Sequence, residues 1–86
     1  MMEVRYRPRF KREYKKLPAE IQDTTDARVK IFTKNPFDSR LKTHKLRGDL
    51  VDFFAFSVNY RYRILFDFVD SDIAEFYSIG DHDIYE

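Results

Sequence analysis

The sequence predicts a small α+β fold in which a helical hairpin packs on an antiparallel sheet, in the element order β-α-α-β-β-β. Three observations predict it. Residues 59–69 alternate between apolar and other side chains, which is typical of a strand with one buried face. Residues 9–17 and 18–34 have apolar residues at helical spacing, and several β-forming runs separated by turn residues follow them. In the alternating strand, the side chains expected in the core are Tyr60, Tyr62, Ile64, Phe66 and Phe68.

The length and composition favour one domain that spans residues 1–86 and has a single modest core. The chain has 86 residues, of which 43% are hydrophobic, and nine Phe and six Tyr can fill such a core. Cysteine is absent, which excludes disulfides and thiolate metal sites. No apolar run approaches the roughly 20 residues that span a bilayer, and residues 1–10 are too charged for a signal peptide. We therefore expect a soluble protein of the cytoplasm.

The first half of the chain predicts a strand followed by two helices. Residues 2–7 form the strand, and Pro8 suits a first helical turn because its φ is fixed and it lacks an N–H. The first helix, residues 9–17, is amphipathic and strongly cationic. Pro18 starts the second helix, which ends at the breaker pair Asn35 and Pro36. The apolar face of the first helix consists of Phe10, Tyr14 and Leu17.

The second half predicts a three-stranded meander. Residues 35–48 are polar and basic and are expected to form a connecting loop. The runs 53–58, 59–69 and 73–79 then follow one another with turn residues between them. Consecutive strands with such short connections pair antiparallel, and the N-terminal strand can join the sheet at an edge.

The charges are distributed unevenly along the chain. Residues 1–48 hold fourteen Lys or Arg against six Asp or Glu, whereas residues 49–86 hold two against nine. Those two cations, Arg61 and Arg63, stand two residues apart in the alternating strand, so both are expected on one face of the sheet. Each could form a cross-strand ion pair, and together they could bind an anion. The candidate ion-pair partners are Asp52, Asp67 and Glu75.

The two histidines are further candidates for chemistry. His82 and Tyr85 follow the last strand directly and could lean back over the sheet toward the arginines. The alternative is a frayed terminus in which Asp81 and Asp83 only favour the charged form of His82. His44 lies in the expected basic loop and has a similar alternative as a solvated residue.

Several segments, taken in this order, resemble a known family. They are residues 10–18, Asn35 with Pro36, residues 44–48, residues 62–66 and residues 79–85. They resemble the RelE/ParE superfamily of toxins from type II toxin–antitoxin modules. The most specific parts are the Arg-Ile-Leu-Phe strand and the Gly-x-His-x-x-Tyr ending, and the resemblance covers nearly the whole chain. It is closer to the RelE, YoeB and YafQ branch, and to the plasmid-stabilisation proteins grouped with it, than to the gyrase-poisoning ParE branch.

The resemblance implies a ribosome-dependent endoribonuclease, an mRNA interferase that cuts mRNA in the ribosomal A site, inhibits growth and is held inactive by an antitoxin. It implies that no metal or other cofactor is needed. Arg63 stands at the family's strand arginine, and Arg61 enters only through the face it shares with Arg63. The chain departs from RelE at Phe54 and Phe56, where RelE has lysines, which argues against a lysine-based mechanism. The remaining correspondences are His82 with a terminal Arg or His, Tyr85 with a terminal Tyr, and His44 with a carboxylate or histidine.

The chemistry expected is attack of a ribose 2′-OH on the adjacent phosphate with loss of the 5′-oxygen. It requires a base, an acid and a cation at the phosphorane, roles that suit the two histidines and Arg63. Two alternatives stay open: a ParE-like toxin that binds a protein target such as gyrase without cleaving anything, and a degenerate protein that only binds an antitoxin. The residues expected to contact ribosomal RNA through its phosphates are Arg9, Lys11, Arg12, Lys15, Lys16, Arg40, Lys42, Lys45 and Arg47.

Overall fold

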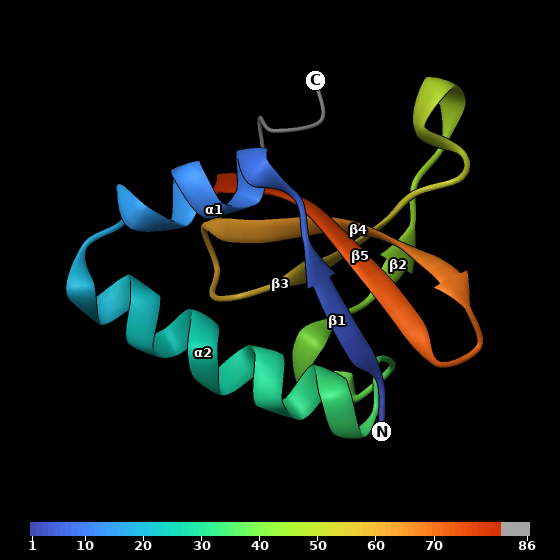
Figure 1. Cartoon of the computed structure of the whole chain (residues 1–86), viewed down its shortest axis with the longest axis horizontal. Coiled ribbons are helices and arrows are strands. Elements are labelled where there is room, and N and C mark those ends of the chain that lie inside the picture. Colours follow the sequence, from blue (N-terminus) through green and yellow to red (C-terminus); the bar gives the residue numbers. More distant parts are fainter. Residues whose placement is uncertain (82–86) are drawn as a thin grey trace.

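The computed structural model describes residues 1–81, and in it two helices lie along a five-stranded sheet (Figure 1). The predicted α+β class and the order of the predicted elements are confirmed, with one short strand added. Two 3-10 helices are also present: η1 (Ser39–Leu41) between α2 and β2, and η2 (Gly48–Leu50) between β2 and β3. The other elements are β1 (Glu3–Tyr6), α1 (Pro8–Lys15), α2 (Ala19–Lys34), β2 (His44–Lys45), β3 (Phe54–Ser57), β4 (Tyr62–Asp70) and β5 (Ile73–Asp81).

The strands lie in the order β1-β5-β4-β3-β2. β3, β4 and β5 form the antiparallel meander that the sequence predicts, and β1 joins its edge parallel to β5, with Val4 opposite Ala74. The first and last strands of the chain are therefore neighbours, as the blue and red arrows of Figure 1 show. No helix within residues 1–81 is long and apolar enough to cross a membrane.

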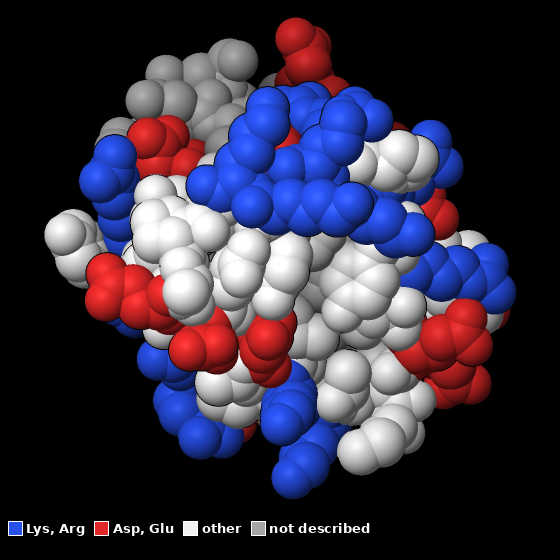
Figure 2. Space-filling model, turned by 60° about the vertical axis from the view of Figure 1, so that its left-hand side comes forward, with Lys and Arg blue, Asp and Glu red and all other residues white. Residues whose placement is uncertain are grey.

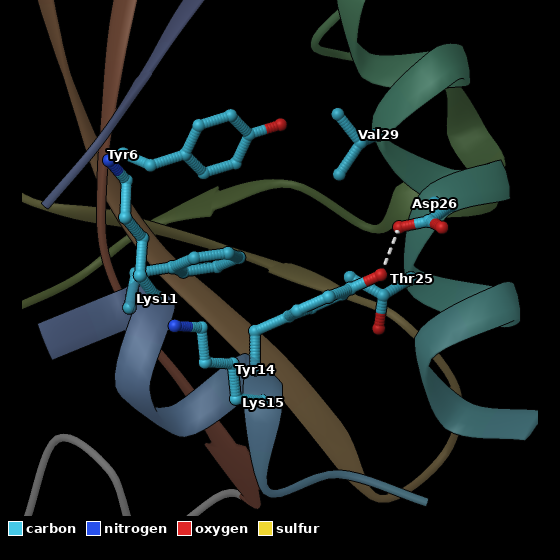
Figure 3. Close-up of a pocket in the computed structure, with 8 residues that line it drawn as sticks. Tyr6, Lys11, Tyr14, Lys15, Thr25, Asp26 and Val29 are labelled. Atoms are coloured by element: carbon cyan, nitrogen blue, oxygen red, sulfur yellow. Dashed lines mark hydrogen bonds between the residues drawn. The ribbon is translucent and has the colours of Figure 1, made fainter. Parts of the chain in front are cut away.

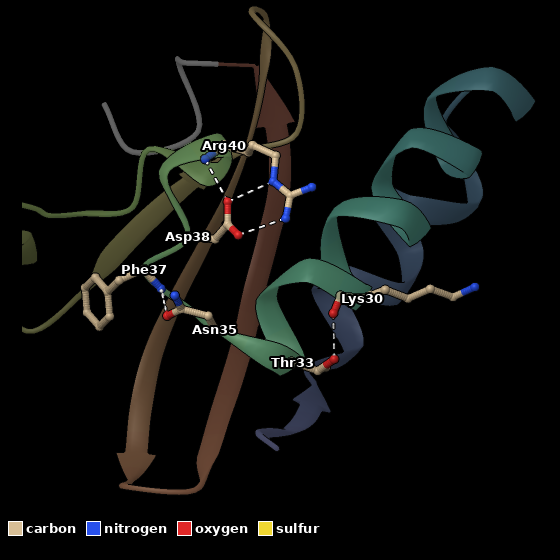
Figure 4. Close-up of polar contacts among 6 residues, drawn as sticks. All are labelled: Lys30, Thr33, Asn35, Phe37, Asp38 and Arg40. Carbon is tan, nitrogen blue, oxygen red and sulfur yellow. Dashed lines mark hydrogen bonds and ion pairs between the residues drawn. The ribbon is translucent and has the colours of Figure 1, made fainter.

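Residues 35–48 are not only the connecting loop that the sequence predicts, because they include β2. His44 and Lys45 pair antiparallel with β3, and His44 lies opposite Ala55. Side chains fix the turns before this strand: Asn35 Oδ1 accepts a hydrogen bond from the backbone N–H of Phe37 at 3.0 Å, as Figure 4 shows. In the same view Asp38 accepts from the backbone and the guanidinium of Arg40. These hydrogen bonds lower the pKa of Asp38 to about 2.

The main core is a cluster of aromatic rings between α2 and the sheet. Phe32 of α2 is fully buried, and its ring centroid lies 5.0 Å from that of Phe56, 4.9 Å from that of Phe66 and 5.1 Å from that of Phe76. Edge-to-face and offset contacts at such distances stabilise a core beyond the area that they bury. The prediction for Phe66 and Ile64 is confirmed, since both are fully buried here.

The prediction that Tyr60 belongs to this core is wrong. β4 begins at Tyr62, so Tyr60 lies in the turn before the strand and is 90% exposed. Tyr62 and Phe68 do pack against the core, and both are half-buried. The alternation in the sequence therefore extends beyond the strand, because a turn can continue it by chance.

The first helix covers a strand edge that β1 leaves open. β1 pairs with β5 only as far as Phe76, and α1 contacts β5 beyond that point. The Glu13 carboxylate of α1 accepts hydrogen bonds from Ser78 Oγ at 2.7 Å and from the backbone N–H of Ile79 at 3.1 Å. An unpaired edge would leave these donors buried without acceptors. A helix side chain thus takes the place of a further strand.

A smaller apolar cluster lies on the side of the sheet opposite α2. Leu46, Ala55 and Leu65 are buried there, and Phe53 and Tyr77 pack against them. The side of β4 on which the sequence predicts an anion-binding site is therefore partly occupied by a second core. What remains open on this side lies nearer the N-terminal end of β4.

Candidate functional site

We call the side of the sheet opposite α2 the open face, and strand register places several predicted site residues on it. Directly paired residues of antiparallel strands point to the same side. His44 is paired with Ala55 and Ala55 with Leu65, while Arg63 is paired with Ser57 two residues away. The buried cluster of Ala55 and Leu65 marks the open face. His44 and Arg63 are therefore presented on the same side of the sheet.

Arg63 is held by backbone carbonyls through one of its three guanidinium nitrogens. Nη1 donates to the carbonyl of Asn59 at 2.7 Å and to the carbonyl of Tyr62 at 3.1 Å. Within residues 1–81, Nε and Nη2 make no hydrogen bond and no ion pair. These two nitrogens form the edge of a guanidinium whose parallel N–H groups match two oxygens of a phosphate or carboxylate. The half-buried side chain is thus anchored at one end and available to an anion at the other.

The expectation that Arg61 and Arg63 form a pair on one face is wrong. Arg61 precedes β4, and its guanidinium carbon lies 5.6 Å from the centroid of the Tyr62 ring, a cation–π contact. Tyr62 packs on the α2 side, whereas Arg63 belongs to the opposite parity of the strand. Of these two arginines, Arg63 is therefore the one on the open face.

The ion pairs considered for these arginines do not form within the described part of the chain. Glu75 pairs instead with Arg7 at 3.2 Å, and Asp67 accepts a hydrogen bond from the Tyr77 hydroxyl at 3.3 Å. Neither Arg61 nor Arg63 makes an ion pair with Asp52, Asp67 or Glu75 there.

His44 has a more defined setting than a solvated loop residue. Its Nδ1 lies 3.0 Å from the carbonyl oxygen of Lys42, and a carbonyl can only accept, so Nδ1 carries the proton. In the neutral ring, Nε2 is then the nitrogen with a free lone pair. Two strand spacings and two residues separate His44 from Arg63, which places their Cα atoms about 12 Å apart. Two long side chains can approach a single nucleotide from such positions.

His82 and Tyr85 lie outside the described residues. The last described residues complete β5, where Gly80 is paired with Arg63 and Asp81 with Tyr62. The described chain therefore ends beside the strand position of Arg63.

Sequence reasoning missed Asp67 as a possible proton-transfer group. Its Oδ1 is buried without a hydrogen-bond partner in the described structure, and burial raises its pKa, as do Glu75 and Asp52, against the opposing hydrogen bond from Tyr77. Burial and the neighbouring Asp67 raise the pKa of Tyr77 to about 12. Four residues along β4 separate Asp67 from Arg63, about 13 Å, which is too far for direct cooperation.

Within residues 1–81 no group of three or more His, Cys, Asp or Glu side chains could hold a metal ion.

The cations predicted to bind RNA are all exposed. Figure 2 shows Lys and Arg side chains gathered in a continuous band beside uncharged side chains, with acidic ones beyond. Two of the nine have their charge partly compensated, since Arg9 pairs with Glu13 at 3.3 Å and Arg40 with Asp38 at 2.9 Å. α1 and the residue after it present Arg9, Lys11, Arg12, Lys15 and Lys16, and the segment before η2 presents Arg40, Lys42, Lys45 and Arg47.

A groove of about 370 Å³ separates the two helices (Figure 3). Its wall is largely apolar, with Tyr6 of β1, Phe10 of α1 and Val29 of α2. The Tyr14 hydroxyl donates to Asp26 at 2.7 Å across the groove, and this hydrogen bond raises the pKa of Tyr14 to about 12. The α1 rim is cationic, with Lys11 and Lys15, and the α2 rim is acidic, with Asp26.

No protein-family model and no curated protein sequence matches the chain. Solved structures do match. A YoeB/ParE toxin from Agrobacterium tumefaciens superposes with a TM-score of 0.80 at 15% identity, covering 94% of this chain and 99% of that one. The chain has the RelE-like toxin fold. The resemblance that the sequence motifs indicated is thus confirmed at the level of the fold.

Two matches come from toxin–antitoxin complexes. A chain of the YoeB–YefM complex from Staphylococcus aureus has a TM-score of 0.76 at 16% identity, with 95% of this chain and 98% of that one covered. A chain of the E. coli DinJ–YafQ complex has a TM-score of 0.77 at 12% identity, with 99% and 98% covered. At such identities the RelE-like fold is shared, and residue roles have to be argued from the geometry of this chain.

Proposed function

We propose that this protein is the toxin of a type II toxin–antitoxin pair and that it cleaves mRNA on the ribosome in the cytoplasm. The observation that carries the proposal is the Arg63 guanidinium, anchored at Nη1 and with its Nε and Nη2 edge available on the open face. The RelE-like fold and the presence of His44 on the same face support it. An anchored cation with a free paired edge suits stabilisation of a phosphorane, because its position is fixed before the reaction.

In the proposed reaction a base takes the proton of a ribose 2′-OH, whose oxygen then attacks the adjacent phosphorus. The bond from phosphorus to the 5′-oxygen breaks, and an acid gives that oxygen a proton. His44 suits the base because its Nδ1 is held by the Lys42 carbonyl and its Nε2 has a free lone pair in the neutral ring. We assign the acid to His82, which directly follows Asp81 and whose flanking aspartates favour the charged form. Tyr85 is proposed to stack on a base or to donate its hydroxyl.

The exposed cations of α1 and of residues 40–47 are proposed to contact ribosomal RNA through its phosphates. Such contacts are independent of sequence and weaken as salt rises, because binding releases counterions. Ribosome binding should therefore fall steeply between about 50 and 200 mM salt. Arg40 should contribute less than its neighbours, since Asp38 already binds its guanidinium.

The antitoxin is proposed to dock in the groove between α1 and α2. Its apolar wall suits the apolar side of a segment that folds on binding, and Lys11 and Lys15 suit acidic residues along one flank of that segment. Two of the solved structures with this fold are of toxin–antitoxin complexes, which supports such a partner. Reversing the two charges with Lys11→Glu and Lys15→Glu should weaken the complex by tenfold or more at low salt. An unchanged affinity would place the antitoxin elsewhere.

The experiment that tests the proposed activity is translation in a purified system followed by mapping of the mRNA ends. Arg63→Ala should reduce cleavage by about 10²-fold or more, since it removes one transition-state donor. Arg5→Ala is the matched control, because Arg5 is an exposed arginine on the edge strand β1 and, within residues 1–81, its one ion pair is with Glu3. If Arg63→Ala cleaved as fast as the parent, the role of Arg63 would be structural: its Nη1 would only stabilise the turn before β4.

The histidines can be separated with the same assay. His82→Gln keeps hydrogen-bonding capacity but cannot titrate, so cleavage should fall by about 10²- to 10⁴-fold with ribosome binding nearly unchanged. His44→Gln should also reduce the rate, and the pairing of His44 with Ala55, whose side chain lies on the open face, supports this expectation. A protein that arrested growth without any new mRNA ends would favour the ParE-like alternative, a toxin that binds a protein target.

A further inference from the structure

The turn between β3 and β4 holds Arg63, and Asn59 of that turn takes part in three hydrogen bonds. Asn59 Oδ1 accepts from the backbone N–H of Arg61 at 2.9 Å and from that of Tyr62 at 2.8 Å. The backbone carbonyl of the same Asn59 accepts from Arg63 Nη1 at 2.7 Å. The side chain of Asn59 thus shapes the turn, and its carbonyl holds the arginine.

We propose that Asn59 is the positioning residue of Arg63. Asn59 affects the substrate phosphate only by holding the Arg63 guanidinium in place. Its amide oxygen fixes the turn in the conformation that presents the Asn59 carbonyl to Nη1, and this leaves the Nε and Nη2 edge facing the substrate. The inference rests on the proposed function, since it assumes that Arg63 binds the scissile phosphate.

An arginine needs such help because its side chain is long and flexible. The arginine side chain has many accessible rotamers, and a free guanidinium would occupy many positions around a phosphate. Two carbonyls at 2.7 and 3.1 Å from the same Nη1 select one of them. Misplacement by about 1 Å can cost up to about 10²-fold in rate. The carbonyls must therefore themselves be held in place.

The turn is also fixed from the side of the helices. Arg28 of α2 donates through Nε to the carbonyl of Val58 at 3.1 Å, and the Val58 side chain is fully buried in the core. The backbone N–H of Val58 donates in turn to the Tyr62 carbonyl at 2.9 Å, the same carbonyl that accepts from Arg63. Asn59 therefore lies between Val58, which is anchored in the core, and the start of β4. Its own side chain fixes the rest of the turn through the backbone N–H groups of Arg61 and Tyr62.

The choice of asparagine is consistent with this role. An Asx turn needs one side-chain oxygen as an acceptor, which Asn and Asp both supply and Ala does not. Asn supplies it without a charge, whereas Asp would place a negative charge next to the site proposed for a phosphate. Asn59→Asp should accordingly keep the turn but weaken binding of the anion, and Asn59→Ala should loosen the turn itself.

The test is a double-mutant cycle on mRNA cleavage in the purified translation system. Asn59→Ala should reduce cleavage by about 10-fold to about 10²-fold in the parent and cause no further loss in the Arg63→Ala background. Asp70→Ala is the matched control: it removes the Asx turn between β4 and β5, at the opposite end of β4 from Arg63, and should leave cleavage unchanged in both backgrounds. An equal loss from Asn59→Ala in both backgrounds would show that Asn59 only maintains the fold, and no loss in the parent would also overturn the proposal.

A second readout does not depend on cleavage. In ¹⁵N NMR spectra the Arg63 guanidinium, assigned by its absence in Arg63→Lys, should show slow rotation about the Nε–Cζ bond in the parent and in Asn59→Asp. The rotation should be faster in Asn59→Ala, because the carbonyls that hold Nη1 would no longer be fixed. If the rotation did not change, Asn59 would not position Arg63. If the parent protein cleaved no mRNA but the rotation changed as expected, the proposed function would fail while the positioning remained.

Discussion

Removing the Glu13 carboxylate should destabilise the fold strongly, although Glu13 belongs to no predicted site. In the Glu13→Ala variant, the Ser78 hydroxyl and the Ile79 backbone N–H lose their shared acceptor at 2.7 and 3.1 Å. Ser78 is fully buried and Ile79 is 2% exposed. Both donors would therefore be left inside the protein without an acceptor.

The size of the effect follows from these two donors. A buried donor without a partner costs about 1 to 3 kcal/mol, and Glu13, whose side chain is 29% exposed, leaves a space that water can partly enter. We therefore expect a loss of about 2 to 4 kcal/mol in the free energy of unfolding. For a chain of this length 1 kcal/mol shifts the melting temperature by about 4 to 8 °C, so Tm should fall by about 8 to 32 °C. The exposed contact of Glu13 with Arg9 adds little to this sum.

Thermal and urea unfolding followed by circular dichroism would measure the change. Glu13→Gln keeps one amide oxygen as an acceptor and should lose about 1 kcal/mol or less. Glu20→Ala is the matched control, since Glu20 is an exposed helical glutamate whose loss should cost under about 1 kcal/mol. A Glu13→Ala variant that melted within about 3 °C of the parent would refute the view that this carboxylate completes the edge of β5.

Three further predictions concern the core and the open face. Phe32→Ala should cost about 3 to 5 kcal/mol in urea unfolding, because its fully buried ring contacts three others. The pKa of Asp67 is raised in the folded protein, so folding favours its protonated carboxyl. Its contribution to the free energy of unfolding is therefore fully present below the ordinary pKa of 3.8 and is lost as the pH rises through the raised pKa. Asp67→Asn should therefore raise Tm at pH 7, and this gain should shrink as the pH is lowered toward 3.8; an equal gain at both pH values would contradict the assignment. Arg61→Ala should slow cleavage by less than about tenfold, against about 10²-fold or more for Arg63→Ala, because Arg61 stacks on Tyr62 rather than facing the site.

The sequence alone was sufficient for the elements with long, regular patterns. Two helices bounded by Pro8, Pro18 and Asn35 lie within one or two residues of their predicted ends, because proline acts on the local backbone. The meander of three strands was also predictable, since short connections leave little choice of pairing. Arg63 could be singled out for the same reason: a cation within a strand pattern is visible without any tertiary contact.

Only the tertiary structure decided which of the candidate residues share a site. A strand of two residues has no period, so His44 appeared to lie in a loop until its pairing with Ala55 placed it on the open face. Arg61 continued the alternation of β4 but lies in the turn, where the Asn59 side chain rather than the sheet directs the chain. The anchoring of Arg63 Nη1, the burial of Asp67 and the acceptor role of Glu13 depend on contacts between distant or turn residues. Periodicity records which side of an element faces the core, but hydrogen bonds across the fold determine which polar groups remain free to act.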